Sequence, residues 1–322
     1  MIRPLAILAP LYAAGLAAKN AAYDRGWVKP QRLAWPVVSV GNLSVGGAGK
    51  TPLVIRLAQL LAAKNIPVDV LSRGYGRSGY GVERVDAEGE AARFGDEPLL
   101  IARATGVPVY VGASRHDAGL LAEHNASSPG LHLLDDGFQH RKLARNLDIV
   151  VVHASDFVES LLPAGRLREP LTSLKRASVI VLRSEDRKLE AELRTRGILV
   201  PVWIQHRRLT AEFVTHAVAF CGIARPEEFF SALRSQNVEL AATLTLRDHQ
   251  AYSKAEIERL LETLRRHKAE CFVTTEKDAA RMTHAQRARL EEGAPLRVAR
   301  LEVSLEDEGA VVRQLLSLIV RK

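Results

Sequence analysis

Residues 36–51 read PVVSVGNLSVGGAGKT, and this stretch decides the fold. Its first part, PVVSV, is a short apolar run typical of a buried strand, and a glycine-rich turn follows it. Beyond the turn, apolar residues recur at the spacing of a helix, at Leu53, Leu57, Leu60 and Leu61. Strand, glycine-rich loop and helix in this order are the context of a phosphate-binding loop. We therefore predict an α/β protein of the P-loop NTPase type, with a mostly parallel sheet flanked by helices.

The loop carries the residue types that phosphate binding needs. Its glycines let backbone N–H groups curl around phosphate oxygens, Lys50 would reach the β- and γ-phosphates, and the Thr51 hydroxyl would bind Mg²⁺. The pattern G-x-x-x-x-G-K-[ST] fails only at its first position, where Ser44 stands. The glycines that follow supply flexibility nearby. We predict an ATP site at Ser44, Val45, Gly46, Gly47, Ala48, Gly49, Lys50 and Thr51.

A second apolar run, residues 131–134, ends in Asp135-Asp136-Gly137. A strand of a parallel sheet delivers carboxylates in this way to the edge beside a phosphate loop. We predict that Asp135 and Asp136 take part in binding Mg²⁺. Taken alone, the same residues would equally suit a turn that ends the strand.

Residues 95–98, Gly-Asp-Glu-Pro, precede another helical stretch. Asp96 would suit the N-cap of that helix, and Pro98 its first turn. A kinase that acts on an alcohol also gains from a carboxylate placed to accept the hydroxyl proton. Asp96 is therefore a candidate both for a cap and for a general base, and the two roles are compatible.

Composition limits the partners. The 322 residues include 45 Lys and Arg against 37 Asp and Glu, a formal net charge of +8, which favours phosphates, anionic lipid or nucleic acid. Aromatic residues make up only 5% and no zinc-finger spacing is present, so we expect no nucleic-acid binding. Cys221 and Cys271 form no Cys-x-x-Cys pair, so we expect buried thiols in a reduced, cytosolic protein.

The N-terminus differs from the rest of the chain. Residues 4–18, PLAILAPLYAAGLAA, are almost wholly apolar or small, and Lys19, Arg25, Lys29 and Arg32 follow. The run is short for a membrane span and contains Pro10. We predict a helix that lies in the membrane interface, as the nearby Trp27 and Trp35 suggest. The alternatives are a helix packed on the protein's own core and, less well supported by the single Arg3, a signal peptide.

The second half predicts a smaller α/β unit. Apolar strands at 217–221, 240–246 and 271–275 alternate with helical patterns such as 256–264. We predict a membrane-associating segment at 1–30, a P-loop kinase core at 31–205 and a C-terminal subdomain at 206–322 that closes a cleft. Thr275-Glu276-Lys277-Asp278 follows a strand, and would either contact nucleotide or cap a helix.

These residues resemble the tetraacyldisaccharide 4′-kinases of lipid A biosynthesis. The resemblance rests on GNLSVGGAGKTP at 41–52, SRGYGR at 72–77, GDEP at 95–98, LLDDGFQH at 133–140, GRLREP at 165–170 and the pair Asp248-His249. It implies an enzyme that uses ATP and Mg²⁺ to phosphorylate the 4′-hydroxyl of a tetraacyldisaccharide 1-phosphate, a membrane glycolipid, and forms lipid IV-A. It also implies a peripheral protein on the anionic cytoplasmic face of the bacterial inner membrane, and no obligate protein partner is evident.

The resemblance assigns roles by position. It implies that Asp96 is the catalytic carboxylate, that His249 orients it and adjusts its basicity, and that Lys50 acts on the phosphates. Without the resemblance, His249 would be an ordinary surface histidine. The implied metal and water ligands are Glu97, Asp135 and Asp136 beside Thr51. The implied substrate residues are Tyr75, Arg115, Gln139, His140 and Arg168.

Two other functions remain open at this stage. The Gly-Gly-x-Gly-Lys-Thr form of the loop would suit an ATPase of the partitioning or metal-insertion kind, which acts as a switch. A kinase with a small, soluble acceptor would also fit, and its apolar N-terminus would then be core.

Overall fold

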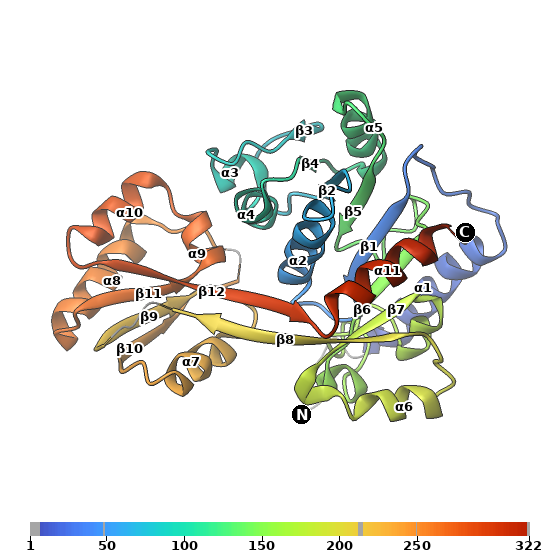
Figure 1. Ribbon diagram of the computed structural model, residues 1–322. Coiled ribbons are helices and arrows are strands. Elements are labelled where there is room, and N and C mark those ends of the chain that lie inside the picture. Colours follow the sequence, from blue (N-terminus) through green and yellow to red (C-terminus); the bar gives the residue numbers. More distant parts are fainter. Residues whose placement is uncertain (1–6, 48, 212–214, 249, 321–322) are drawn as a thin grey trace.

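The computed structural model describes residues 7–47, 49–211, 215–248 and 250–320, built around one continuous sheet (Figure 1). The strands lie in the order β10-β9-β11-β12-β8-β7-β6-β1-β5-β2-β4-β3. Their bounds are β1 (Val37–Asn42), β2 (Val68–Ser72), β3 (Glu83–Arg84), β4 (Val109–Val111), β5 (Leu131–Asp135), β6 (Leu147–Val151), β7 (Val179–Arg183), β8 (Val202–Thr210), β9 (Ala217–Cys221), β10 (Leu240–Thr245), β11 (Cys271–Thr275) and β12 (Leu296–Leu305).

The helices flank this sheet. They are α1 (Ala9–Asp24), α2 (Lys50–Ala62), α3 (Ala91–Phe94), α4 (Asp96–Thr105), α5 (Arg115–Asn125), α6 (Leu189–Thr195), α7 (Pro226–Ser235), α8 (Lys254–His267), α9 (Glu276–Arg281), α10 (His284–Glu291) and α11 (Glu308–Val320). Short 3₁₀ turns at Ala154–Phe157, Leu171–Arg176 and Ser184–Asp186 complete the connections.

Strand pairing is mostly parallel. β1 lies between β5 and β6 and pairs with both in parallel, with Val40 opposite Asp135. Within the part of the chain that the structure describes, the antiparallel pairs are β3 with β4 and β8 with β12. The predicted P-loop type of α/β fold is confirmed.

Alternating side chains on the central strands build two cores. Val70 of β2 and Leu133 of β5 pack with Leu53, Leu57 and other apolar residues of α2. Their neighbours Leu71 and Leu134 point to the opposite face and pack with α5. Because successive side chains of a strand point to opposite faces, each strand is buried on both sides. This explains why the sequence shows short continuous apolar runs.

The C-terminal part repeats this layering on a smaller scale. Phe220 of β9 packs against α8, whereas its neighbours Ala219 and Cys221 pack against α7. Both cysteines are buried free thiols, as predicted. The long strands β8 and β12 continue the sheet into the first part, where α11 packs beside α2 (Figure 1). The division at 205/206 stays a prediction.

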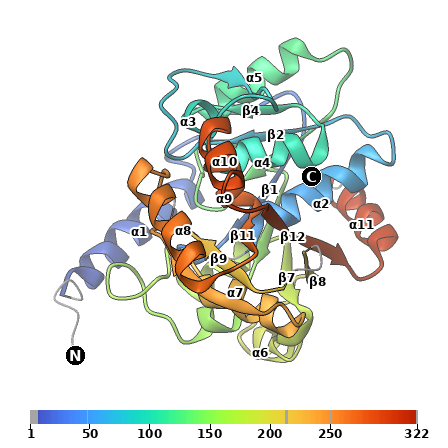
Figure 2. The same cartoon turned by 90° about the vertical axis from the view of Figure 1, so that its left-hand side faces the viewer.

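Helix α1 lies at the edge of the molecule (Figure 2). None of its residues is fully buried, but residues such as Tyr12, Leu16 and Asn20 are half-buried against the rest of the protein, so a helix packed on the protein's own core stays an alternative. Polar contacts also attach it, because the Tyr12 hydroxyl donates to the Arg168 carbonyl at 2.9 Å and the Asn20 amide donates to Glu169 at 3.2 Å. Among the described residues, no helix is long and apolar enough to cross a membrane.

Candidate active site

The predicted phosphate loop connects β1 to α2. Helix α2 begins at Lys50, and Gly46 and Gly49 take positive φ angles of 95° and 82°. Glycine suits position 46 because residues with a side chain rarely adopt a φ of 95°. The Arg166 carbonyl accepts from the Val45 N–H at 2.8 Å, and its guanidinium donates back to the Val45 carbonyl at 3.1 Å. Ala48, one of the predicted ATP-binding residues, lies outside the described residues.

Lys50 lies at the centre of a polar cluster. Its Nζ donates to Asn42 Oδ1 at 2.9 Å and lies 3.4 Å from Asp136 Oδ1. Arg168 donates to both carboxylate oxygens of Asp136 at 2.9 Å and to Asn42 Oδ1 at 2.5 Å. Sequence reasoning did not single out Asn42, the last residue of β1. Its signal was its place directly before the loop.

The predicted metal carboxylates have opposite electrostatic surroundings. Burial, with repulsion from Glu97 and Asp136, raises the pKa of Asp135 to about 7. Burial also acts to raise the pKa of Asp136, but Lys50 and Arg168 outweigh it and lower that pKa to about 2. Asp135 is the last residue of β5, and Asp136 follows with a left-handed φ of 51°.

One oxygen of Asp135 has no hydrogen-bond partner. Its Oδ2 accepts from the Ser72 hydroxyl at 3.3 Å, but its buried Oδ1 accepts from no described residue. A buried carboxylate oxygen of this kind suits a divalent cation, which would favour the charged form. Among the described residues, no group of three or more His, Cys, Asp or Glu forms a metal cage. Proteins usually bind Mg²⁺ through one or two carboxylates together with substrate phosphates, and Asp135 and Asp136 are candidates for these carboxylates.

Asp96 opens α4 but does not cap it. Gly95 is the N-cap, with a φ of 93°, and no side chain caps the helix. The expectation of an Asp96 N-cap is therefore wrong, because the chain needs the glycine conformation one residue earlier, where Gly95 lies against Gly74. Asp96 is the first helical residue and is buried, and Pro98 lies in the first turn as predicted. Its position at the positive end of the helix dipole favours the charged carboxylate.

Two basic residues of α9 meet the Asp96-Glu97 pair. Sequence reasoning named Lys277 only within a motif that would contact nucleotide or cap a helix, and it did not name Arg281. Arg281 Nε lies 3.0 Å from Asp96 Oδ2, and Lys277 forms an ion pair with Glu97. Burial acts to raise the pKa of Glu97, but Lys277 outweighs it and lowers that pKa. The only sequence signal was the spacing of Lys277 and Arg281, four residues apart on a helix. Thr275, in the same motif, caps α9 by accepting from the Asp278 N–H.

The predicted substrate residues gather around this cluster to different degrees. Gln139 donates to the Asn42 carbonyl at 2.9 Å. Burial and Arg73 lower the pKa of Arg115 to about 10, while the charges of Asp135 and Asp136 act in the opposite direction. Burial, together with Arg115 and other cations, lowers the pKa of His140 to about 4.

Of the predicted site residues Tyr75 and His249, only Tyr75 is among the described residues. Tyr75 is exposed, on a loop whose Gly74 lies against Gly95 and hence beside Asp96. His249 lies outside the described residues. Its neighbour Asp248 is described and, with Glu97 and Asp96, raises the pKa of Lys277 against the effect of burial. Asp248 is therefore close to the charges that surround Asp96.

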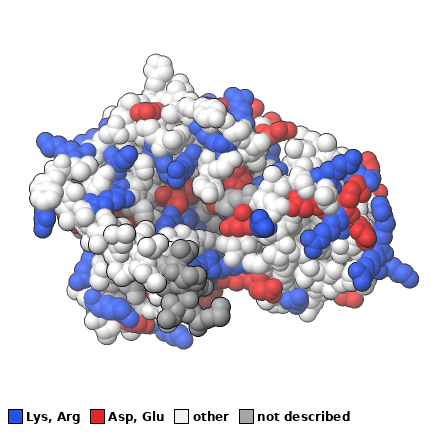
Figure 3. Space-filling model, turned by 180° about the vertical axis from the view of Figure 1, so that it is seen from behind, with Lys and Arg blue, Asp and Glu red and all other residues white. Residues whose placement is uncertain are grey.

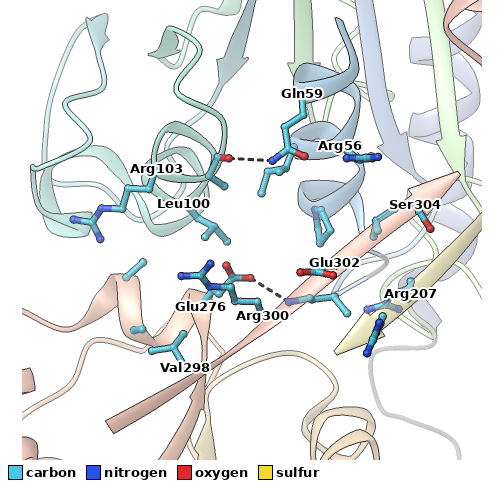
Figure 4. A pocket seen from close by; sticks show the side chains of 18 of the residues that line it. Arg56, Gln59, Leu100, Arg103, Arg207, Glu276, Val298, Arg300, Glu302 and Ser304 are labelled. Atoms are coloured by element: carbon cyan, nitrogen blue, oxygen red, sulfur yellow. Dashed lines mark hydrogen bonds between the residues drawn. The ribbon is translucent and has the colours of Figure 1, made fainter. Parts of the chain in front are cut away.

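Acidic and basic side chains gather around a central hollow on the face opposite to that of Figure 1 (Figure 3). A separate groove of about 870 Å³ is bounded by α2 and α4 on one side and by α9 and β12 on the other (Figure 4). Its lining is rich in basic side chains, namely Arg56, Arg103, Arg207, Arg208, Arg287 and Arg300. The groove leaves open space between these surfaces, while α2 and β12 share the core that contains Leu57 and Val303.

Comparison with known proteins places the chain among kinases. The family model described as tetraacyldisaccharide-1-P 4′-kinase matches residues 1–320. A tetraacyldisaccharide 4′-kinase of Koribacter versatilis is 44% identical, with 98% of each chain covered. One from Geobacter metallireducens is 39% identical, covering 86% of this chain and 88% of the relative. The crystal structure of LpxK from Aquifex aeolicus in complex with ATP matches with a TM-score of 0.74 and 30% identity over 97% of both chains.

Proposed function

The chain belongs to the tetraacyldisaccharide-1-P 4′-kinase family, and from this we propose that it transfers the γ-phosphate of ATP to the 4′-hydroxyl of a tetraacyldisaccharide 1-phosphate. The product would be lipid IV-A, in lipid A biosynthesis. One structural observation supports the proposal most directly. The phosphate loop and the carboxylates of Asp96, Asp135 and Asp136 converge with the basic groups of Lys50 and Arg168.

The nucleotide would lie at the N-terminus of α2. The first N–H groups of a helix have no partner within the helix, and the helix dipole favours negative charge there. Lys50 and Arg168 now neutralise Asp136, so ATP phosphates entering the site would share both cations. Positioning and charge neutralisation supply most of the catalysis of phosphoryl transfer.

The residues present fit Mg²⁺. Asp135 would bind it through the buried Oδ1 that has no described hydrogen-bond partner, with Thr51 beside it and Asp136 and Glu97 nearby. When bound, the metal would neutralise charge that develops on the β- and γ-phosphates. The division of roles among these carboxylates stays a prediction.

Asp96 would accept the proton of the acceptor hydroxyl. It is buried at the start of α4, and its Oδ2 is fixed by Arg281. A sugar hydroxyl is a poor nucleophile until its proton has an acceptor, so a positioned carboxylate is the group the reaction needs. His249 is proposed to orient Asp96, and the closeness of Asp248 to Lys277 supports that.

The lipid acceptor would be reached from the membrane surface. Apolar side chains of the N-terminal segment are exposed, with Ile7 at 81% and Leu11 at 72%. Trp27 is also exposed, and the Arg25 guanidinium lies 5.0 Å from its ring centroid. Apolar insertion together with Arg and Lys attraction to anionic headgroups would hold a peripheral protein on the cytoplasmic face of the inner membrane.

Radiolabel transfer tests the proposal. The protein is incubated with γ-labelled ATP, Mg²⁺ and the tetraacyldisaccharide 1-phosphate in mixed micelles, and labelled lipid is measured, with Lys50→Ala as the inactive control. We expect label in the lipid. ATP hydrolysis without labelled lipid would favour the switch ATPase, and equal transfer to the deacylated disaccharide would favour a kinase with a soluble acceptor. The family match favours neither.

A further inference from the structure

Helix α9 presents two cations to two consecutive carboxylates on another helix. Lys277 and Arg281 are one helical turn apart, so both side chains point the same way. Their partners, Glu97 and Asp96, are the first two residues of α4. The partners lie 180 and 185 residues apart in sequence, so these contacts tie the C-terminal part to the phosphate-loop part.

We propose that this pair of contacts, here called the α9 clamp, makes Arg281 a positioning residue that holds Asp96 in its working orientation. The α9 clamp is Lys277 with Glu97 and Arg281 with Asp96. This inference rests on the proposed role of Asp96 as the proton acceptor. It adds that Asp96 is correctly placed only while the C-terminal part is docked against α4.

The contact between Arg281 and Asp96 is buried, and burial restricts the orientation of the Asp96 carboxylate. The side chains of Arg281 and Asp96 are each only 6% exposed. Two charges removed from water must stay paired, because separating them leaves an uncompensated buried charge. The contact at Oδ2 therefore restricts the Asp96 carboxylate to one rotamer. Oδ1 accepts from the Glu97 N–H at 2.9 Å, which fixes the plane of the carboxylate further.

Arg281 is itself held in place from behind. Its Nη1 lies 3.3 Å from Asp278 Oδ1, and Asp278 is fully buried. The same carboxylate accepts from the Tyr252 hydroxyl at 2.8 Å, the Gly222 N–H at 2.9 Å and the Thr275 hydroxyl at 2.6 Å. Arg281 therefore transmits the position of β9, β11 and α9 to Asp96.

The groove of Figure 4 shows why such a contact matters. Its walls are α2 and α4 on one side and α9 and β12 on the other, and α4 also packs directly against α9 beside it. The α9 clamp joins α4 to α9 beside that space and fixes their separation at Asp96. An error of about 1 Å in the position of a catalytic group can cost roughly a hundredfold in rate. Closure by the α9 clamp would thus link domain docking to chemistry and limit wasteful ATP hydrolysis.

Steady-state kinetics test the positioning role. Arg281→Gln should lower kcat by roughly a hundredfold and leave KM for ATP within about twofold, because nucleotide binding does not use Arg281. Arg281→Lys keeps the charge and should recover part of the loss. In an Asp96→Asn background, Arg281→Gln should lower kcat little further, because the effects of residues that act as one unit are non-additive. Arg289→Gln, which removes an exposed ion pair between α10 and Glu258, is the matched control and should leave kcat unchanged.

A distance measurement separates this inference from the proposed function. Spin labels on Leu120→Cys of α5 and Glu262→Cys of α8 report the separation of the two parts in the full chain. Arg281→Gln should broaden the distance distribution, while Arg289→Gln should not. Full activity of Asp96→Asn would refute the proposed role of Asp96, and with it the positioning role, even if the distribution broadens. An unchanged distribution, or losses in kcat that multiply fully with those of Asp96→Asn, would overturn the α9 clamp while leaving Asp96 as the base.

Discussion

Replacing Asp135 by Asn should stabilise the metal-free protein at alkaline pH. The carboxylate is buried, and burial with repulsion from Glu97 and Asp136 raises its pKa from the ordinary 3.8 to about 7. In the pH range between these values, the folded state binds a proton that the unfolded state has lost. The free energy of unfolding therefore falls as pH rises through this window, and stays lowered above it. Asn has nearly the same shape and carries no charge at any pH.

The size of the effect follows from the pKa. A rise from 3.8 to about 7 corresponds to a loss of up to about 4 kcal/mol of stability once the group is ionised in both states. We expect Asp135→Asn and wild type to unfold with similar free energies near pH 4. As pH rises to 8, the free energy of unfolding of the variant should become larger than that of wild type. The variant should also lose kinase activity, because Mg²⁺ loses a ligand.

Urea unfolding between pH 4 and pH 8, with and without Mg²⁺ and ATP, measures both effects. Mg²⁺ with ATP should stabilise the wild type more than it stabilises Asp135→Asn, because binding to the native state alone adds to stability. Asp86→Asn is the control, since it removes an exposed carboxylate from a turn and Asn keeps an acceptor for the Glu88 N–H. A variant that is less stable than wild type at pH 8 would refute the reasoning. The reasoning would also be refuted if Mg²⁺ with ATP stabilised Asp135→Asn as much as wild type.

Three further results are expected. Lys50→Ala should abolish transfer to the lipid, and activity within a few-fold of wild type would remove the phosphate-loop assignment. Asp96→Ala should lower kcat by roughly a hundredfold or more with little change in KM for ATP. His249→Ala should lower kcat less, and the loss of kcat in the double variant should scarcely exceed that of Asp96→Ala alone. Deleting residues 2–20 should weaken flotation with anionic liposomes and its salt sensitivity, and unchanged binding would contradict membrane docking.

The sequence predicted the central fold well because its signals are local. The buried strands at Val37–Asn42 and Leu131–Asp135 read as short apolar runs, and the strands at Ala217–Cys221 and Cys271–Thr275 were placed to the residue. Each of these strands is covered on both faces, so burial alone dictates its composition. The continuity of one sheet from β10 to β3 was not predictable, because it depends on the pairing of β8 with β12 at a distance in the sequence.

The site residues that were predicted are those that follow neighbouring strands of the sheet and belong to recognisable motifs. The loop at Lys50 and the carboxylates after β5 belong to neighbouring parallel strands, so their meeting follows from topology. The contacts of Arg281 and Lys277 with Asp96 and Glu97 were not predicted, because only tertiary packing brings α9 to α4. The role of Asp96 as an N-cap was wrong for a related reason, because Gly95 lies against Gly74 and caps the helix, so the helix starts one residue earlier than predicted.

The attachment of α1 connects the proposed membrane surface with the proposed site. Its Tyr12 and Asn20 contact Arg168 and Glu169, and its Lys19 donates to the Gln139 carbonyl at 3.2 Å. Arg168 in turn holds Asp136. A helix whose apolar side chains are exposed thus shares direct contacts with the loops beside the phosphate-transfer cluster. An acceptor with acyl chains in the membrane interface would then present its sugar to the site without leaving the lipid, so the full cost of transferring those chains to water would not enter the barrier.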